Sequence, residues 1–284
     1  MSRALRSLPA LLREAEVCLW RGEAAAGIAA SREARAVCAT LPASAMPRRE
    51  ARLAANLHGA LLHLAGDYDE AEEFLDEALA LAEAAARHGL AHDQFVCCAG
   101  ALGDLGSNAL ALGDAGKALA CSKRAEYMLN RAYRPSHAAQ GALRVTLGLS
   151  QSAIGDHAAA LRSHQQALAQ LTSPPAIAAH APPMWSLAAR VGAIAAAASL
   201  GDAQTARGLA DEALAASSGA PVGTDGGEVS REAIRAVVAM AEAAADQPAS
   251  APAAPWLPAL GAGVALDGYA LQQAEVGDAG KRDE

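Results

Sequence analysis

Aromatic residues are scarce in this chain, at 3% of the sequence, although hydrophobic residues make up 52%. Ala and Leu therefore supply most of the apolar side chains. A β-sheet favours β-branched and aromatic residues, whereas Ala and Leu are strong helix formers. At 284 residues the chain is long enough to bury a sizeable core. The composition predicts an all-α protein.

Clustered positive charge is also lacking. The chain has 31 acidic and 23 basic residues, a formal net charge of -8, and no block of Lys and Arg. Binding to a phosphate backbone needs such a basic surface. We therefore expect no nucleic acid among the partners.

The sequence has few signs of disulfide or cofactor chemistry. Its five cysteines are odd in number and contain no C-x-x-C spacing, which indicates buried thiols in a reducing compartment. The G-x-x-x-x-G-K-[ST], G-x-G-x-x-G and G-x-S-x-G motifs are absent. We expect no cofactor, no catalytic residues and no enzymatic activity.

Long apolar runs that could cross a membrane are missing too. Arg13 and Glu14 interrupt the N-terminal apolar segment, and the uncharged run of residues 247–266 contains four prolines. We expect a cytoplasmic protein without membrane contact. The Ala-rich composition indicates a bacterial source.

A kernel of Gly followed by an acid recurs along the chain. The glycines are 44, 47, 42 and 46 residues apart, and they are Gly22, Gly66, Gly113, Gly155 and Gly201. Five residues after each stands a small residue: Gly27, Ala71, Ala118, Ala160 and Ala206. Twelve residues after each stands an alanine: Ala34, Ala78, Ala125, Ala167 and Ala213. Seven residues before each stand Ala15, Gly59, Gly106, Gly148 and Ile194.

This register is typical of helix hairpins. Gly accepts the left-handed conformation that ends one helix, and the acid favours the start of the next. Small residues fall where the two helices cross, and hairpins must stack to bury their apolar stripes. Prolines and glycines that break helices, together with helix-capping residues, predict five hairpins, at about 8–41, 48–88, 92–134, 136–172 and 183–217. We expect a final helix at 228–246 to cap a repeat domain of residues 1–246, and residues 247–284 to form a mobile tail rich in Pro, Ala and Gly. A short helix at 269–275 would fold back on the stack.

The unit "LAANLHGALLHLAGDYDEAEEFLDEALALAE" (53–83) carries Gly59, Gly66, Tyr68, Ala71 and Ala78 in this register. It resembles the tetratricopeptide repeat family, and the likeness extends over residues 8–218. The repeats are longer than is usual in that family and lack its aromatic residue after the turn elsewhere. They are similar to divergent repeats of bacterial regulators and peptide sensors. The resemblance implies a right-handed α-solenoid of about five hairpins plus a capping helix.

In that family, ligands lie in a concave groove lined by the first helix of each hairpin. Counting 10, 6 and 3 residues back from each turn glycine gives one lining residue per helical turn. This count names Asn56, Ala60, His63, Gly103, Ser107, Leu110, Val145, Leu149, Ser152, Val191, Ala195 and Ala198. Such a lining suits an apolar or amphipathic peptide, or a helix of a partner. Each of these residues has the alternative role of packing against the adjacent repeat.

Other side chains admit two interpretations. Arg144 and Arg190 stand eleven residues before their turn glycines, so that either their stems pack and their guanidinium groups reach water, or they contact an anionic ligand in the groove. His157 and His164 replace aromatics as packing residues, or respond to pH.

The best metal-like cluster is His88, His92, Cys97 and Cys98. Gly89 separates the two histidines, so they need not share a helix face. The alternative is a set of loop histidines and buried thiols.

The leading functional hypothesis is a non-enzymatic scaffold or regulatory module that binds a protein or peptide in the concave groove. The alternative is a sensor of a small molecule or signalling peptide that uses the same groove, and a metal-assisted enzyme is a third hypothesis. A homodimer through an uncapped end of the stack is also compatible with this fold.

Overall fold

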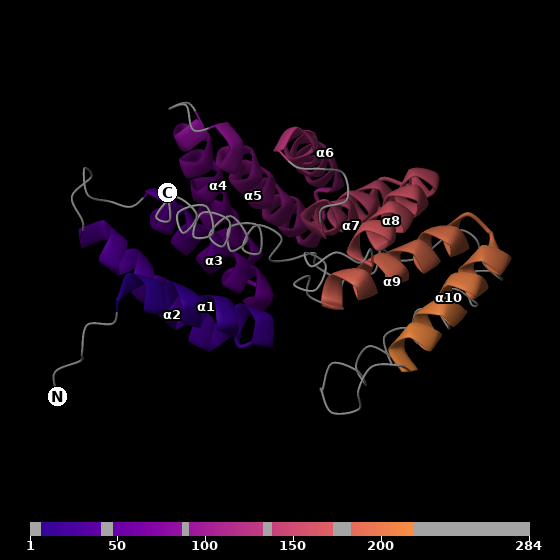
Figure 1. Ribbon diagram of the computed structural model, residues 1–284, viewed down its shortest axis with the longest axis horizontal. Coiled ribbons are helices and arrows are strands. Elements are labelled where there is room, and N and C mark those ends of the chain that lie inside the picture. Colours follow the sequence, from indigo (N-terminus) through magenta and orange to yellow (C-terminus); the bar gives the residue numbers. More distant parts are fainter. Residues whose placement is uncertain (1–6, 41–47, 87–90, 133–137, 173–182, 219–284) are drawn as a thin grey trace, which may run out of the picture. The chain divides into compact units, whose positions relative to one another are not determined.

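The computed structural model describes residues 7–40, 48–86, 91–132, 138–172 and 183–218. These ranges hold ten helices and no strand, which confirms the predicted all-α repeat architecture (Figure 1). The helices are α1 (Leu8–Arg21), α2 (Ala24–Thr40), α3 (Arg48–Ala65), α4 (Tyr68–Ala86), α5 (Ala91–Ala111), α6 (Ala115–Ala132), α7 (Ala138–Ala153), α8 (His157–Leu171), α9 (Pro183–Ser199) and α10 (Ala203–Ser218). The predicted hairpin ranges agree with these bounds to within a few residues.

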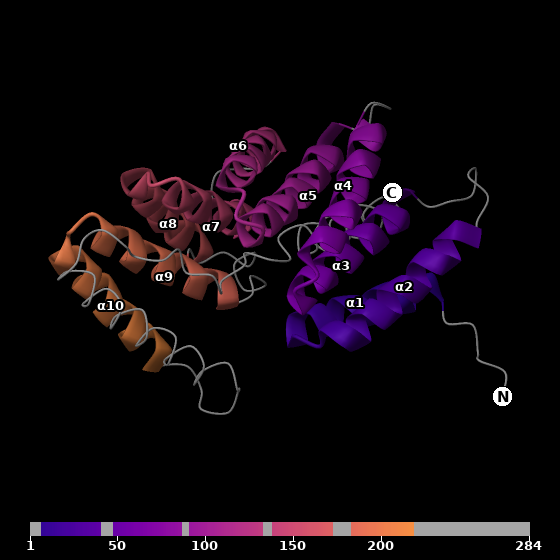
Figure 2. The ribbon, with the colours of Figure 1, turned by 180° about the vertical axis from the view of Figure 1, so that it is seen from behind.

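Each predicted turn glycine ends the first helix of its hairpin. All five adopt positive φ angles, between 73° and 91°. A side chain with a Cβ is disfavoured in this left-handed region, which explains why glycine recurs there. Figure 2 shows the tight reversal from α9 to α10 that Gly201 allows.

The acid after the glycine starts the second helix of several hairpins. A side-chain oxygen of Asp156 accepts a hydrogen bond from the backbone N–H of Ala159, at 3.0 Å. Asp114 and Asp202 accept equivalent bonds from residues three positions further on, at 2.8 and 3.0 Å. These carboxylates satisfy N–H groups that the first turn of a helix leaves without a partner.

The small residues that stand seven before, five after and twelve after each turn glycine are all buried. Gly59 shows why size matters there, because a methyl group built on it would lie 2.7 Å from Cγ of Leu75. A contact that short would force one helix away from the other. The glycine thus lets α3 and α4 approach closely.

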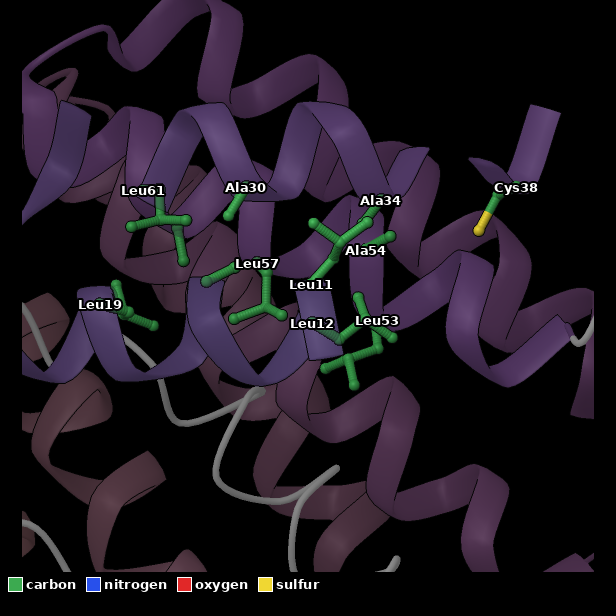
Figure 3. Close-up of a cluster of buried hydrophobic side chains, with 12 residues drawn as sticks. Leu11, Leu12, Leu19, Ala30, Ala34, Cys38, Leu53, Ala54, Leu57 and Leu61 are labelled. Carbon is green, nitrogen blue, oxygen red and sulfur yellow. The ribbon is translucent and has the colours of Figure 1, made fainter. Parts of the chain in front are cut away.

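The described helices fall into two compact units. The first unit contains α1 to α5 and the second half of α6, from Arg124. Within it, α1 contacts α2 and α3, and α4 contacts α3 and α5. Leucines of α1 and α3 meet alanines of α2 in its core, where Leu57 and Leu61 lie close to Ala30 (Figure 3).

The second unit contains the first half of α6 and helices α7 to α10. Here α8 contacts both α7 and α9, and α9 contacts α10. Val191 and Ile194 of α9 form a core with three alanines of α10. Each unit therefore builds its core by stacking successive hairpins.

Three predictions fall outside the described residues: the capping helix at 228–246, the tail from 247, and the short helix at 269–275. The division into a repeat domain of residues 1–246 and a tail therefore stays a prediction. Among the described residues, none of the helices has the length and apolar character needed to span a bilayer.

Candidate functional site

The first helices of neighbouring hairpins touch one another within each unit. In the first unit α3 contacts both α1 and α5, and in the second unit α7 contacts α9. Between the second helices α2 and α4, by contrast, the long side chains of Arg35 and Glu77 form an ion pair at 2.8 Å. Among the described helices, the first helices, which carry the predicted lining residues, thus approach one another more closely than the second helices do.

Asn56, the first polar residue of the predicted groove, lies between α3 and α5. Its Nδ2 donates a hydrogen bond to Oδ2 of Asp104 at 3.2 Å. Only 2% of Asn56 and none of Asp104 is exposed. The Oδ1 atom of Asn56 is buried without a hydrogen-bond partner among the described residues. The side chain therefore links two neighbouring hairpins instead of facing open solvent.

His63 makes a similar link one turn before Gly66. Its Nδ1 lies 2.9 Å from Oδ1 of Asn108 in α5, and Nδ2 of Asn108 donates to the carbonyl of Tyr68 at 2.9 Å. The His63 and Tyr68 rings meet edge to face, with their centroids 5.0 Å apart. Burial lowers the pKa of His63, whereas the bond with Asn108 acts in the opposite direction. A neutral His63 donates its Nδ1–H to the Asn108 oxygen.

The other predicted lining residues divide into two groups. Ser107, whose Oγ donates to the carbonyl of Gly103 at 3.1 Å, is buried. Val145 is buried as well. The half-buried group contains Leu110, Leu149, Ser152 and Arg190, together with Ala195 and Ala198. Half-buried residues on first helices are the part of the predicted groove that a ligand could contact.

Sequence reasoning missed the α5 partners, Asp104 and Asn108. They stand four residues apart on a helix that is otherwise largely apolar, as Arg52 and Asn56 do on α3. Two such polar pairs on consecutive first helices are a signal that could have indicated buried contacts between hairpins. His58 was missed too, and its Nδ1 lies 2.8 Å from Oγ of Ser31.

The predicted metal-like cluster is only partly described. His88 and the side chain of His92 lie outside the described residues. Cys97 and Cys98 are buried, and they pack with Ala82 of α4 and Met128 of α6. Among the side chains that the structure places, no group of three His, Cys, Asp or Glu could hold a metal ion. These thiols therefore contribute to an apolar core.

The two remaining histidines differ in their surroundings. His157 is half-buried at the start of α8, whereas His164 has no exposed surface. Arg144 and Arg190 are both half-buried, which is compatible with packed stems and hydrated guanidinium groups.

Comparison with known proteins supports the repeat interpretation. Residues 97–173 match the family model described as tetratricopeptide repeat, and the resemblance predicted from the turn glycines is thus confirmed. No curated protein sequence matches the chain.

Nineteen chains of solved structures are similar in fold. One is the crystal structure of BtubC (BKLC) from P. vanneervenii. It is 18% identical, with a TM-score of 0.57 over 74% of this chain and 80% of that chain. At this identity the likeness shows the helical-repeat fold alone.

Proposed function

We propose that this chain is a non-enzymatic scaffold or regulatory module that binds a protein or peptide along its first helices. Tetratricopeptide repeats generally mediate interactions between proteins, and they are typically scaffolds without enzymatic activity. The observation that carries the proposal is that successive first helices lie in contact within each unit. This packing presents several helices side by side, which is the surface that a peptide or partner helix needs.

The ligand-contacting residues in the second unit would be Leu149, Ser152 and Arg190. All three are half-buried and stand on α7 or α9. A leucine and an arginine on neighbouring helices suit an amphipathic segment, because Leu binds its apolar face and Arg its acidic or carbonyl groups. In the first unit, Leu110 would take the corresponding apolar role.

A protein or peptide is a better candidate than nucleic acid because the chain has a net charge of -8. The five cysteines are free thiols, and four of them are buried. Free thiols support a reducing compartment, so we place the interaction in the cytoplasm.

The sensor hypothesis depends on isolated polar residues facing the groove. Asn56, His63 and Ser107 are buried, and each makes a hydrogen bond inside the protein. A small molecule would have to break these bonds to use the same atoms. Protein or peptide binding through the half-buried residues therefore has the stronger support.

The test is affinity capture from native lysate with matched variants of the full chain. Leu149→Glu places a charge in the proposed contact, and Gln165→Glu places the same charge on the exposed surface of the second helix α8. We expect one or more reproducible partners with the wild type and Gln165→Glu, and at least tenfold weaker capture with Leu149→Glu. Equal capture by both variants would place the partner elsewhere, and a bound small metabolite without any partner would favour the sensor.

Self-association through an end of the stack is a separate proposal. Sedimentation velocity of the purified chain over a hundredfold range of concentration tests it. A single monomeric species throughout would remove it, and a reversible dimer would support it.

A further inference from the structure

His164 occupies a slot between two glycines in the second unit. It lies on α8 with no exposed surface. A methyl group built on Gly148 of α7 would lie 2.7 Å from the Cε1 and Nε2 atoms of its ring, and one on Gly192 of α9 would lie 2.4 Å from the same atoms. The tip of the imidazole therefore rests directly against the backbones of both neighbouring helices, where a larger residue than glycine would not fit.

Neither ring nitrogen of His164 has a hydrogen-bond partner among the described residues. The backbone groups around it belong to helices, whose carbonyls already accept bonds within the helix. A neutral imidazole leaves one N–H donor and one acceptor unsatisfied. An imidazolium would leave two donors and a full positive charge in the same slot, which costs considerably more.

No opposite charge faces the ring from the helices around it. The only charged residue of α7 is Arg144, and the only one of α9 is Arg190. On α8 itself the titratable and charged groups are His157 and Arg162.

The nearest acids along the chain are all exposed. Asp156 caps the N-terminal end of α8, about two helical turns from His164, and Asp202 stands just before α10. Asp211 and Glu212 lie on α10, which packs on α9. The helices that contact α8 thus carry arginines and no carboxylate that could compensate the charge of a protonated His164.

The same register position in the other hairpins is filled without a titratable group. Nine residues after the turn glycine stand Ser31, Leu75, Ser122, His164 and Ala210. All five are buried. Ser31 and Ser122 make side-chain hydrogen bonds, and Leu75 packs against Gly59 as His164 packs against Gly148. The hairpin fold therefore does not require a histidine at this position, and Leu75 shows a suitable replacement.

We propose that His164 makes the packing of α7, α8 and α9 sensitive to acid, so that protonation of its ring separates α8 from the two neighbouring helices. The charged ring can be hydrated only if the slot between Gly148 and Gly192 opens. Because α8 joins α7 to α9, opening this slot loosens the fourth and fifth hairpins together.

The direction of the pH effect follows from the thermodynamic linkage between proton binding and folding. Burial lowers the pKa of His164 from 6.5 to about 4. A lowered pKa means that the folded state binds the proton more weakly than the unfolded state does. The full stability is present above pH 6.5, and it is lost as the pH falls from 6.5 toward 4. Between these two pKa values the ratio of folded to unfolded protein falls by up to tenfold per pH unit, and the full loss of roughly 300-fold is reached only below pH 4.

The test compares the full-length wild type with His164→Leu by hydrogen exchange between pH 7 and 4.5, after correction for intrinsic exchange rates. We expect protection of α7, α8 and α9 to fall with decreasing pH in the wild type and to change at least tenfold less in His164→Leu. The matched control is His58→Leu, because burial lowers the pKa of His58 in α3 to about 4 as well. This control should leave the pH dependence of α7 to α9 unchanged.

His164→Gln is a second variant, which removes the titration and keeps a polar side chain, in case His164→Leu does not fold. An unchanged pH dependence in the folded non-titrating variant would overturn the proposal. The proposal would also be overturned if the control variant His58→Leu removed the pH dependence of protection in α7 to α9.

Discussion

Leu75 packs directly against Gly59 in the second hairpin, where α3 and α4 cross. Its side chain has no exposed surface, and neither has Ala71, whose carbonyl lies 3.1 Å from a methyl group built on Gly59. The contact is set by rigid backbone on one side and by a packed leucine on the other. The spacing of the two helices is therefore sensitive to a single methyl group.

Gly59→Ala tests this crossing. We expect a loss of about 1–3 kcal/mol in the free energy of unfolding, because the added methyl overpacks the contact. This loss should exceed the gain of about 1 kcal/mol that Ala brings to a helix. Urea unfolding followed by circular dichroism measures the difference.

The control for Gly59→Ala is Gly208→Ala. Gly208 is exposed on α10, and a methyl group on it would meet no atom within 4 Å. This variant should gain about 0.5–1 kcal/mol. Equal stabilisation by both substitutions would contradict the close crossing at Gly59.

Gly155→Ala tests the left-handed turns. Gly155 has a φ of 85° and an open environment, so any effect of a methyl group comes from the backbone conformation. We expect a loss of about 1–2 kcal/mol. Gly155→Asn should cost less, because Asn accepts this conformation more readily. A thermal or urea unfolding series in which Ala is tolerated better than Asn would refute this explanation.

Asn108→Ala tests the polar contacts between first helices. The substitution removes the partner of His63 Nδ1 and the donor to the carbonyl of Tyr68. Leaving a buried polar group unsatisfied costs about 1–3 kcal/mol.

Ser107→Ala, on the neighbouring residue, is the matched control for Asn108→Ala. The Ser107 hydroxyl donates to a carbonyl of its own helix, so we expect a smaller loss in the same unfolding experiment. A loss as large as that of Asn108→Ala would show that the hydrogen bonds of Asn108 between hairpins stabilise the fold no more than a hydrogen bond within one helix does.

Arg35 links the second helices α2 and α4 by two interactions. Its guanidinium group pairs with Glu77 at 2.8 Å and lies 4.2 Å from the centre of the Phe74 ring. Partly exposed ion pairs contribute at most about 1 kcal/mol, and a cation–π contact of this kind adds about 0.5–1 kcal/mol.

Glu77→Gln, which keeps the ring contact, should therefore cost less than Arg35→Ala. Only the ion-pair contribution should weaken in high salt. Equal losses in the two variants, measured by urea unfolding at low and high salt, would indicate that the ring contact contributes nothing.

The hairpins could be predicted because their signals are local. A glycine with positive φ, an acid three residues before a helical N–H and a small residue at each crossing all act within one hairpin. Gly66 and Ala78, for example, fulfil their predicted roles without reference to the rest of the chain. The bounds of α3 and α4 therefore agree with the predicted range of 48–88.

The lining of the groove was harder to predict because burial depends on neighbouring hairpins. Asn56 and Ser152 belong to the same counted set, yet Asn56 is buried against Asp104 whereas Ser152 is half-buried. Burial at each counted position depends on the helices of the neighbouring hairpins, which no single hairpin encodes. Residues 133–137 and 173–182, which join hairpins, lie outside the described part of the chain.

Within each unit, a hairpin makes its contacts with the hairpins directly before and after it. Such an arrangement is modular, because adding or deleting one whole hairpin leaves the remaining junctions intact. Duplication of a gene segment of about 45 codons could therefore extend the row of first helices in steps without a new fold. Point changes within one module would then alter its part of the proposed binding surface, while its neighbours keep their geometry.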